Sequence, residues 1–341
     1  MRRTPLALLS AALLLLPVAA YAQQRPQQQQ NRPPQTQPAP RLAPISLSGR
    51  YLAARVGEQD HDYDAAADQL DQALLQTPGD PDLVYGAFRL RLYAGRFDSA
   101  IELAPAVLRA RPGDGFANLA LAVQQIRKGE YKAAEQQLAR IGTENQLGVL
   151  REYVMAWLKA GEKDFGAARA FLARLKPAAG ERAEAPALVI EAQIDEMAGD
   201  KAAAEAKYRR AASLDRNGLR TTVAVAEGLR RLGKDADARE LLRVYGTKYS
   251  DSVVMDGLMG PNAPMPKPPS PASGIAEILF DIGGILGSDP RAQRNDLALI
   301  FYQLATTLKP DQDFGWLMIA GLYEQFQQIP KAIAALGRIR P

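Results

Sequence analysis

One alanine recurs along this chain at nearly constant phase, at Ala66, Ala100, Ala134, Ala168, Ala204, Ala238, Ala298 and Ala332. The first four are 34 residues apart, as are the fifth and sixth and the last two. A fixed period of this length is typical of helix–turn–helix units that stack, because each unit buries its apolar face only against its neighbours. The period therefore predicts an elongated all-α stack of helix pairs and argues against a compact enzyme.

The residues around each alanine predict the second helix of every unit. It is expected to begin on the aromatic residue three positions earlier, as at Tyr63, Phe97, Tyr131 and Phe165. Four positions after the alanine stands a larger side chain, at Leu70, Leu138, Leu172, Tyr208, Leu242, Tyr302 and Leu336. Residues three and four apart share one helical face. The alanine thus lets two backbones approach, while its larger neighbours fill the space beside it.

The first helices carry a second small site, twelve residues before the alanine of the second helix. It is occupied by Ala54, Ala122, Ala156, Ala192, Ala226 and Ala320, with Phe88 as the exception. Four glycines are expected to close the loops inside the pairs in a left-handed conformation, at Gly95, Gly129, Gly199 and Gly233. Prolines are expected to end second helices, at Pro78, Pro112 and Pro310. Asp80 and Asp114 then follow as N-caps of the next helix.

This pattern resembles the tetratricopeptide-repeat family. Trp316, Ile319, Ala320 and Tyr323 match the W-x2-L-G-x2-Y spacing of that family, and Ala332 with Leu336 matches its A-x3-F spacing. The resemblance covers about residues 47–341 except for a Pro-rich break. It implies a right-handed α-α superhelix of about eight helix pairs, whose first helices line a concave face that holds a partner's peptide or helix.

Composition removes most catalytic chemistry. The chain has no cysteine and a single histidine, so disulfides, thiolate sites and multi-histidine metal sites are excluded. His61 lies between two aspartates and is expected to be a solvated loop residue. We therefore expect no enzyme, catalytic residue, cofactor or metal. The net charge of +4 falls to +2 without Arg2 and Arg3, which gives no reason to expect nucleic acid as a partner.

The first 46 residues predict export. Residues 1–22 have the basic start, apolar run and Ala20-Tyr21-Ala22 ending of a bacterial signal peptide, cleaved near Ala22. Residues 23–46 are rich in Gln and Pro and are expected to be a disordered linker. The mature protein is thus predicted to be periplasmic or secreted, with no stable membrane insertion.

A second break divides the repeats. Six prolines fall within residues 261–271, which predicts a linker at 247–273 between six repeats at 47–246 and two at 274–341. That linker is either a hinge between two arrays or a loop crossing one array. Gly274 and Gly287 are interpreted as boundary glycines. A polar capping helix usually closes such arrays, and none follows residue 341. We expect the sequence to be part of a longer protein; alternatively, the exposed end docks onto something.

The first helices carry aromatic residues interleaved with arginines, here called the ladder. Tyr51, Tyr85 and Tyr153 recur in phase, and four positions later stand Arg55, Arg89 and Trp157. Three further members complete the predicted partner-binding set: Tyr93, Phe116 and Arg127. Tyr, Trp and Arg dominate binding hot spots because they combine large contact area with a polar group. The corresponding positions of later repeats are Val189, Gln193, Val223 and Glu227, so the ladder stops after the fourth repeat.

The function expected from these features is a non-catalytic scaffold of the bacterial periplasm or envelope, which binds peptide or helix segments of partner proteins. Two alternatives remain open. The chain is a structural segment of an envelope polysaccharide-secretion or outer-membrane assembly machine, or it is a holdase-like periplasmic chaperone. The scaffold predicts one or two specific partners, whereas a holdase predicts broad binding to unfolded proteins.

Overall fold

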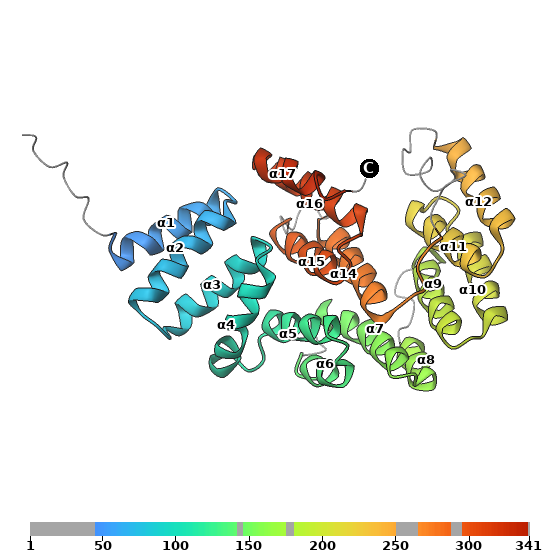
Figure 1. The fold of residues 1–341 in the computed structure, drawn as a ribbon, viewed down its shortest axis with the longest axis horizontal. Helices are drawn as coiled ribbons and strands as arrows, with labels where there is room; N and C mark the ends of the chain where they lie inside the picture. The colour runs from blue at the N-terminus through green and yellow to red at the C-terminus, as the bar shows by residue number, and fades with distance from the viewer. Residues whose placement is uncertain (1–44, 142–145, 175–180, 250–264, 288–294, 340–341) are drawn as a thin grey trace, which may run out of the picture. The chain divides into compact units, whose positions relative to one another are not determined.

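The computed structural model describes residues 45–141, 146–174, 181–249, 265–287 and 295–339. The predicted signal peptide and all but the last two residues of the predicted linker 23–46 lie outside these ranges. Within them the chain forms sixteen α-helices and no strand (Figure 1). The helices are α1 (Leu47–Gln59), α2 (Tyr63–Gln76), α3 (Pro81–Tyr93), α4 (Phe97–Ala110), α5 (Gly115–Arg127), α6 (Tyr131–Leu138), α7 (Gln146–Gly161), α8 (Phe165–Arg174), α9 (Glu181–Met197), α10 (Lys201–Leu214), α11 (Leu219–Arg231), α12 (Asp235–Lys248), α14 (Pro271–Gly287), α15 (Asn295–Leu308), α16 (Asp313–Gln325) and α17 (Ile329–Leu336).

The helices form eight pairs, as the alanine period predicts. All eight recurrent alanines of the second helices are buried, and so are the six alanines and Phe88 at the small site of the first helices. The second helices of the first four pairs begin on the expected aromatics, at Tyr63, Phe97, Tyr131 and Phe165. Small side chains at these two sites bring the paired backbones close, and the all-α repeat architecture is confirmed.

The turn inside a pair has one shared geometry in the seven pairs whose turns the structure describes. Gly95, Gly129, Gly199 and Gly233 have positive φ angles of 72° to 83°, as predicted. The same turn position is occupied in other repeats by His61, Lys163 and Gln327, with φ of 55°, 63° and 59°. A left-handed residue is needed there because the chain must reverse within two or three residues.

Helices α3 and α5 begin directly after the aspartates that were predicted to cap them, Asp80 and Asp114. The Asp80 carboxylate accepts hydrogen bonds from the backbone N–H groups of Asp82 and Leu83, both at 3.0 Å. Asp114 accepts one from the Ala117 N–H at 2.8 Å. Each carboxylate satisfies amide donors that a helix start leaves free, so these predicted caps are confirmed.

The helices on both sides of the Pro-rich break extend further into the predicted linker 247–273 than expected. Helix α12 continues to Lys248, and α14 already begins at Pro271. Pro271 fits the first helical position, because the N–H that proline lacks has no helical partner there. Ser270 and Ser273 cap this start reciprocally: each side-chain hydroxyl accepts from the backbone N–H of the other, at 3.2 and 2.9 Å. Residues 250–264 lie outside the described chain.

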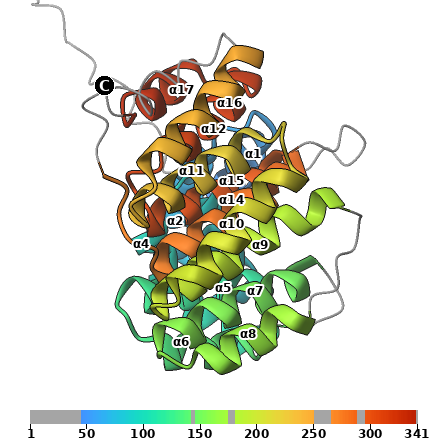
Figure 2. The same cartoon turned by 90° about the vertical axis from the view of Figure 1, so that its right-hand side faces the viewer.

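Two hydrophobic clusters organise the described repeats. The larger combines residues of α1–α8 with those of α14–α17, and the smaller lies within α9–α12. Helices α14 and α15 pack against α3, α5 and α7, which are first helices of the second, third and fourth repeats (Figures 1 and 2). The last two pairs therefore share a core with the first four. Across the described chain, no helix has the length and apolar character that crossing a membrane requires.

Gly274 is not a boundary glycine, as the sequence suggested, but lies inside α14. A Cβ atom at this position would overlap the indole ring of Trp157 on α7. The glycine is needed because the ring lies directly against the α14 backbone. Gly287, in contrast, is the last residue of α14, as expected of a boundary glycine.

Candidate protein-binding surface

The nine residues of the ladder lie on the first helices of the first four pairs, but their exposure differs along the chain. Tyr51 and Arg55 on α1 are exposed, as is Arg127 on α5. Four residues are half-buried: Tyr85, Arg89, Phe116 and Tyr153. Tyr93 and Trp157 are buried. The ladder is therefore most accessible where α1 begins the array.

Helix α1 forms the most exposed end of the ladder, here called its open end. Tyr51 is 49% exposed. Arg55 forms an ion pair with Glu58 one helical turn later, and 54% of its side chain stays exposed. An exposed ion pair of this kind contributes little to stability. Both side chains are thus available to another molecule without loss of structure.

Next to it, α3 carries a cluster of arginines and tyrosines. The Arg89 guanidinium donates to the Tyr93 hydroxyl at 2.8 Å and lies 5.9 Å from the centre of the Tyr85 ring. Arg111, which follows α4, covers the same Tyr85 ring at 4.0 Å. Burial lowers the pKa of Arg89, but the neighbouring tyrosines and Glu58 outweigh it, and the net shift is upward. The positive charge of Arg89 is therefore firmly held beside an aromatic surface.

Arg111 was missed by the sequence analysis because it lies outside the first helices. It stands in the loop after α4, one residue before Pro112. Its guanidinium also forms an ion pair with Asp82 at 3.0 Å. The sequence did place Arg111 directly before Pro112, a proline predicted to end a helix, and this position could have been considered as part of the surface.

The middle of the ladder is in contact with the chain's own last repeats. The Phe116 ring lies 6.1 Å from that of Phe301 on α15. Arg127 faces another way: it forms an ion pair with Asp98 at 2.7 Å and covers the Phe97 ring at 5.4 Å. Phe116 therefore contributes to the α5–α15 contact, while Arg127 ties α5 to α4.

The far end of the ladder is covered by α14. Trp157 is 0% exposed, and its indole packs on the α14 backbone at Gly274. Burial, together with the charge of Asp281 on α14, raises the pKa of Tyr153. The prediction that Trp157 contacts a partner directly does not fit its position, because α14 occupies that surface. Tyr93 is likewise a core residue, stacked on Tyr63 at 4.9 Å.

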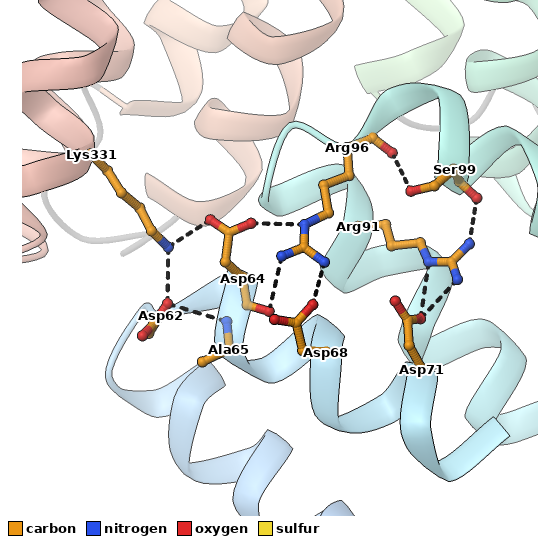
Figure 3. A network of polar contacts seen from close by, with 9 residues as sticks. All are labelled: Asp62, Asp64, Ala65, Asp68, Asp71, Arg91, Arg96, Ser99 and Lys331. Carbon is orange, nitrogen blue, oxygen red and sulfur yellow. Dashed lines mark hydrogen bonds and ion pairs between the residues drawn. The ribbon is translucent and has the colours of Figure 1, made fainter. Parts of the chain in front are cut away.

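An ion-pair network ties the last helix to the first two repeats (Figure 3). The Lys331 ammonium on α17 lies 2.9 Å from carboxylate oxygens of both Asp62 and Asp64. Asp64 also pairs with Arg96 at 2.8 Å, and Arg96 reaches Asp68 at 2.5 Å. The network links three repeats through alternating charges, so α17 is held at the turn between α1 and α2.

His61 belongs to the same contact and is not a solvated loop residue, as the sequence suggested. Its imidazole stacks on Phe326 with ring centres 4.1 Å apart and planes 9° from parallel. Its Nε2 lies 3.5 Å from a carboxylate oxygen of Asp296 on α15. The left-handed turn of the first pair thus places an aromatic side chain against the end of α16.

The comparisons with known proteins agree with this architecture. Residues 59–114, which span α2 to α4, match the family model described as "Tetratricopeptide repeat". No curated protein matches the chain.

Solved structures include similar helical arrays. A tetratricopeptide repeat protein from Parabacteroides merdae shares 13% identity over 86% of this chain and 98% of its own, with a TM-score of 0.49. Yeast Tom70 shares 12% identity over 85% of this chain and 67% of its own, with a TM-score of 0.29. At this level of similarity, neither protein indicates what the present chain binds.

The architecture, the repeat spacing and the family match lead to the same assignment. Each of the eight helix pairs carries a buried alanine on its second helix, six carry one on the first helix as well, and seven of the turns inside the pairs share one left-handed position. The family generally serves as a non-catalytic scaffold for contacts between proteins. The described chain therefore has the helix-pair fold of tetratricopeptide repeats, and its residues 59–114 match the model of that family.

Proposed function

We propose that this protein is an exported bacterial scaffold that binds a peptide or helix of a partner protein at the open end of the ladder. The site consists of Tyr51 and Arg55 on α1 and of Tyr85 and Arg89 on α3. The observation that carries the proposal is that Tyr51 and Arg55 are exposed. They occupy the same repeat positions as Tyr85 and Arg89 of the next repeat.

The chemistry of these four residues favours a partner with acidic and apolar side chains. An arginine pairs bidentately with a carboxylate and stacks on an aromatic ring. A tyrosine offers a large apolar surface and a hydroxyl, so it binds at a low entropic cost. Packing of α14 against α7 supports a helical ligand, because the same ladder accepts a helix there within the chain.

The site can be tested by photo-cross-linking in the bacterial envelope. In one variant a photoreactive benzophenone amino acid replaces Tyr51. In a control variant of the same protein it replaces Arg239, an exposed residue on α12. We expect one or two specific adducts from position 51 that weaken when Arg55→Ala is added. Equal, unspecific labelling at both positions would contradict a defined site and favour a general holdase.

Affinity for the identified partner separates binding from folding. Tyr51→Ala with Arg55→Ala is expected to weaken binding by ~10-fold or more, as hot-spot residues do, with unchanged helical content. The pair Tyr85→Ala with Arg89→Ala should also weaken binding. Arg89 supports Tyr93, so a loss of helical signal in that pair alone would place these two residues in the core.

Export is tested separately. Mass spectrometry of the protein recovered from the envelope should show Gln23 as the first residue, since the predicted cleavage follows Ala22. An intact N-terminus with cytoplasmic recovery would overturn the export proposal and leave the binding site untouched.

A further inference from the structure

The helices of this chain stack by one recurring contact between the second helix of one pair and the first helix of the next. On α2, Leu70 stands four positions after the repeat alanine and faces residue 86 of α3. On α10, Tyr208 occupies the same position and faces residue 228 of α11. Residue 86 stands two positions before the small site of α3, which is Phe88. Residue 228 stands two positions after the small site of α11, which is Ala226. These positions define the face on which a first helix receives the preceding pair.

On α1 this receiving face is apolar, and no residue of the described chain covers it. Its two positions are Leu52 and Val56, which are 64% and 54% exposed. The same two positions on α7 are Val154 and Leu158, and both are fully buried. The first helix of the array therefore exposes the kind of surface that is buried on α7 inside the stack.

On α17 the complementary face is also apolar, and no residue of the described chain covers it. Leu336 corresponds to Leu70 and is 46% exposed, and Ile333 corresponds to Ala67 and is 65% exposed. Leu70 and Ala67 are both buried. Helix α17 thus exposes the surface that second helices inside the array present to the next pair.

Helix α12 shows that an exposed second helix need not be apolar. The position of Ile333 is taken there by Arg239, which is exposed, and Glu240 and Arg243 extend the charged surface. Leu242, at the position of Leu336, is buried. The apolar surface of α17 is therefore a particular property of that helix and not of every second helix in the chain.

We propose that α17 of one molecule stacks on α1 of a second copy, so that the repeat array continues from molecule to molecule. Leu336 would meet Leu52 and Val56 of the next copy. These three side chains are two leucines and one valine. The buried set at the α6–α7 junction has the same composition, with Leu138 on α6 and Val154 and Leu158 on α7. The contact continues an interface that the chain already uses between its own repeats.

This contact joins two different surfaces, so each copy keeps one free end of each kind. Such heterologous association yields open chains of molecules unless the rotation closes a ring. One helix layer is smaller than the roughly 800 Å² per partner of a standard stable interface. The association is therefore weak and depends on concentration.

Sedimentation of the full chain over a wide concentration range tests the proposal. The weight-average mass should rise continuously beyond that of a dimer as concentration increases. A mass that stays at the monomer value at every concentration would overturn the proposal, and would be expected if the chain's own residues before Ile45 covered α1.

Two single variants and their mixture establish the direction of the contact. Leu52→Glu blocks the α1 face, and Ile333→Glu blocks the α17 face; both residues are more than half exposed, so folding is preserved. Each variant alone should be monomeric. Their equimolar mixture should form a dimer and nothing larger, because α17 of the first variant can still bind α1 of the second.

The matched control is Leu75→Glu, which places the same charge at another exposed leucine, 74% exposed on α2. It should associate like the wild type. If Leu52→Glu prevents association while Ile333→Glu still dimerises by itself, and the mixture gives no dimer that contains Leu52→Glu, the contact is a symmetric one through α1 and the proposed stacking is wrong.

Discussion

The first helices of the early and late repeats meet the C-terminal helices in different ways. In the second to fourth repeats, α3, α5 and α7 contact α14 and α15 through apolar and aromatic side chains of one hydrophobic cluster. In the sixth repeat, α11 meets α14 through charge: Arg220 lies 2.6 Å from Glu277 and 2.7 Å from Asp281. Lys309, the residue directly after α15, joins Glu277 at 3.0 Å.

This difference explains where the ladder stops. The positions held by Tyr85 and Arg89 in the second repeat and by Tyr153 and Trp157 in the fourth are occupied in the sixth by Val223 and Glu227. Burial raises the pKa of Glu227, although Lys309 and Arg231 oppose the shift. Much of the ladder therefore serves as a packing surface for α14 and α15 within the chain, and its sequence signature ends where that apolar contact ends.

The apolar side of this comparison predicts the largest loss of stability. Trp157→Ala should lower the free energy of unfolding by about 3–5 kcal/mol, because a fully buried indole leaves a cavity between α7 and α14. Denaturant unfolding followed by circular dichroism measures the change. Trp157→Phe should cost less, since it keeps a ring and removes an indole N–H that has no hydrogen-bond partner in the described chain.

A matched variant tests whether the two clusters unfold separately. Leu242→Ala in α12 removes a buried side chain from the smaller cluster and should cost about 2–5 kcal/mol there. If the clusters are independent, each variant shifts its own transition. A single transition shifted equally by both would show that the ion pairs of α11 couple the clusters tightly.

The charged side of the comparison predicts a smaller effect that depends on salt. Arg220→Met removes the ion pairs to Glu277 and Asp281 and keeps an apolar contact with the Phe280 ring, which the guanidinium covers at 4.1 Å. These groups are about one-third to one-half exposed, so the expected loss is about 1 kcal/mol or less.

The loss from Arg220→Met should shrink between ~0.01 M and ~1 M salt, because ions screen exposed charges. The loss from Trp157→Ala should not change in this way. A salt-independent effect of Arg220→Met would mean that Arg220 acts through packing and not through charge.

The period of the sequence was enough to predict the helix pairs, because each pair repeats the same small and large residues at fixed spacing. It could not predict that α14 returns to α7, since the repeat pattern records only contacts between neighbours. One signal was present in residues 271–287, where glycines and large apolar residues leave few polar positions. A helix with so few polar positions packs against neighbours on more than one side, although Ile285 of α14 is 65% exposed.

The candidate site was predicted in part. Tyr51 and Arg55 are accessible as expected, whereas Trp157 and Tyr93 are buried. Residue type could not separate them, because tyrosine and tryptophan suit a binding surface and a core equally well. What decides is the presence of α14 and α15, which come from more than a hundred residues further along the chain.

The network in Figure 3 predicts a modest effect with a defined pH dependence. Burial alone would raise the pKa of Asp62, but Lys331, the Ala65 N–H and Arg96 outweigh it, and the net shift is downward. A lowered folded-state pKa stabilises the fold above the ordinary carboxyl pKa near ~4, and this contribution is lost as pH falls through the lowered value.

Lys331→Met should therefore cost less than about 1 kcal/mol at pH 7, because these carboxylates are more than one-third exposed. The difference between variant and wild type should shrink as pH falls through the lowered pKa of Asp62, because its carboxylate is then protonated in both states. Urea unfolding across this range measures it. A loss that persists in acid would assign Lys331 a packing role.

The smallest expected effect compares two equivalent turns. Lys163 and His61 both hold a left-handed backbone, at φ of 63° and 55°. Glycine relieves this strain of about 1–2 kcal/mol, offset in part by its greater loss of chain entropy. Lys163→Gly should therefore stabilise the protein by about 0.5 kcal/mol.

His61→Gly relieves the same strain but removes the ring stacked on Phe326, a contact worth about 0.5–1.5 kcal/mol. Its net effect should be near zero or destabilising, measured as the change in the free energy of unfolding. The difference between the two glycine variants then measures what the His61 ring, through Phe326 and Asp296, contributes to holding the last repeats on the first. If both variants stabilise the protein equally, that stacking contributes nothing, and Lys331 with its aspartates is left as the principal link between α17 and the first pair.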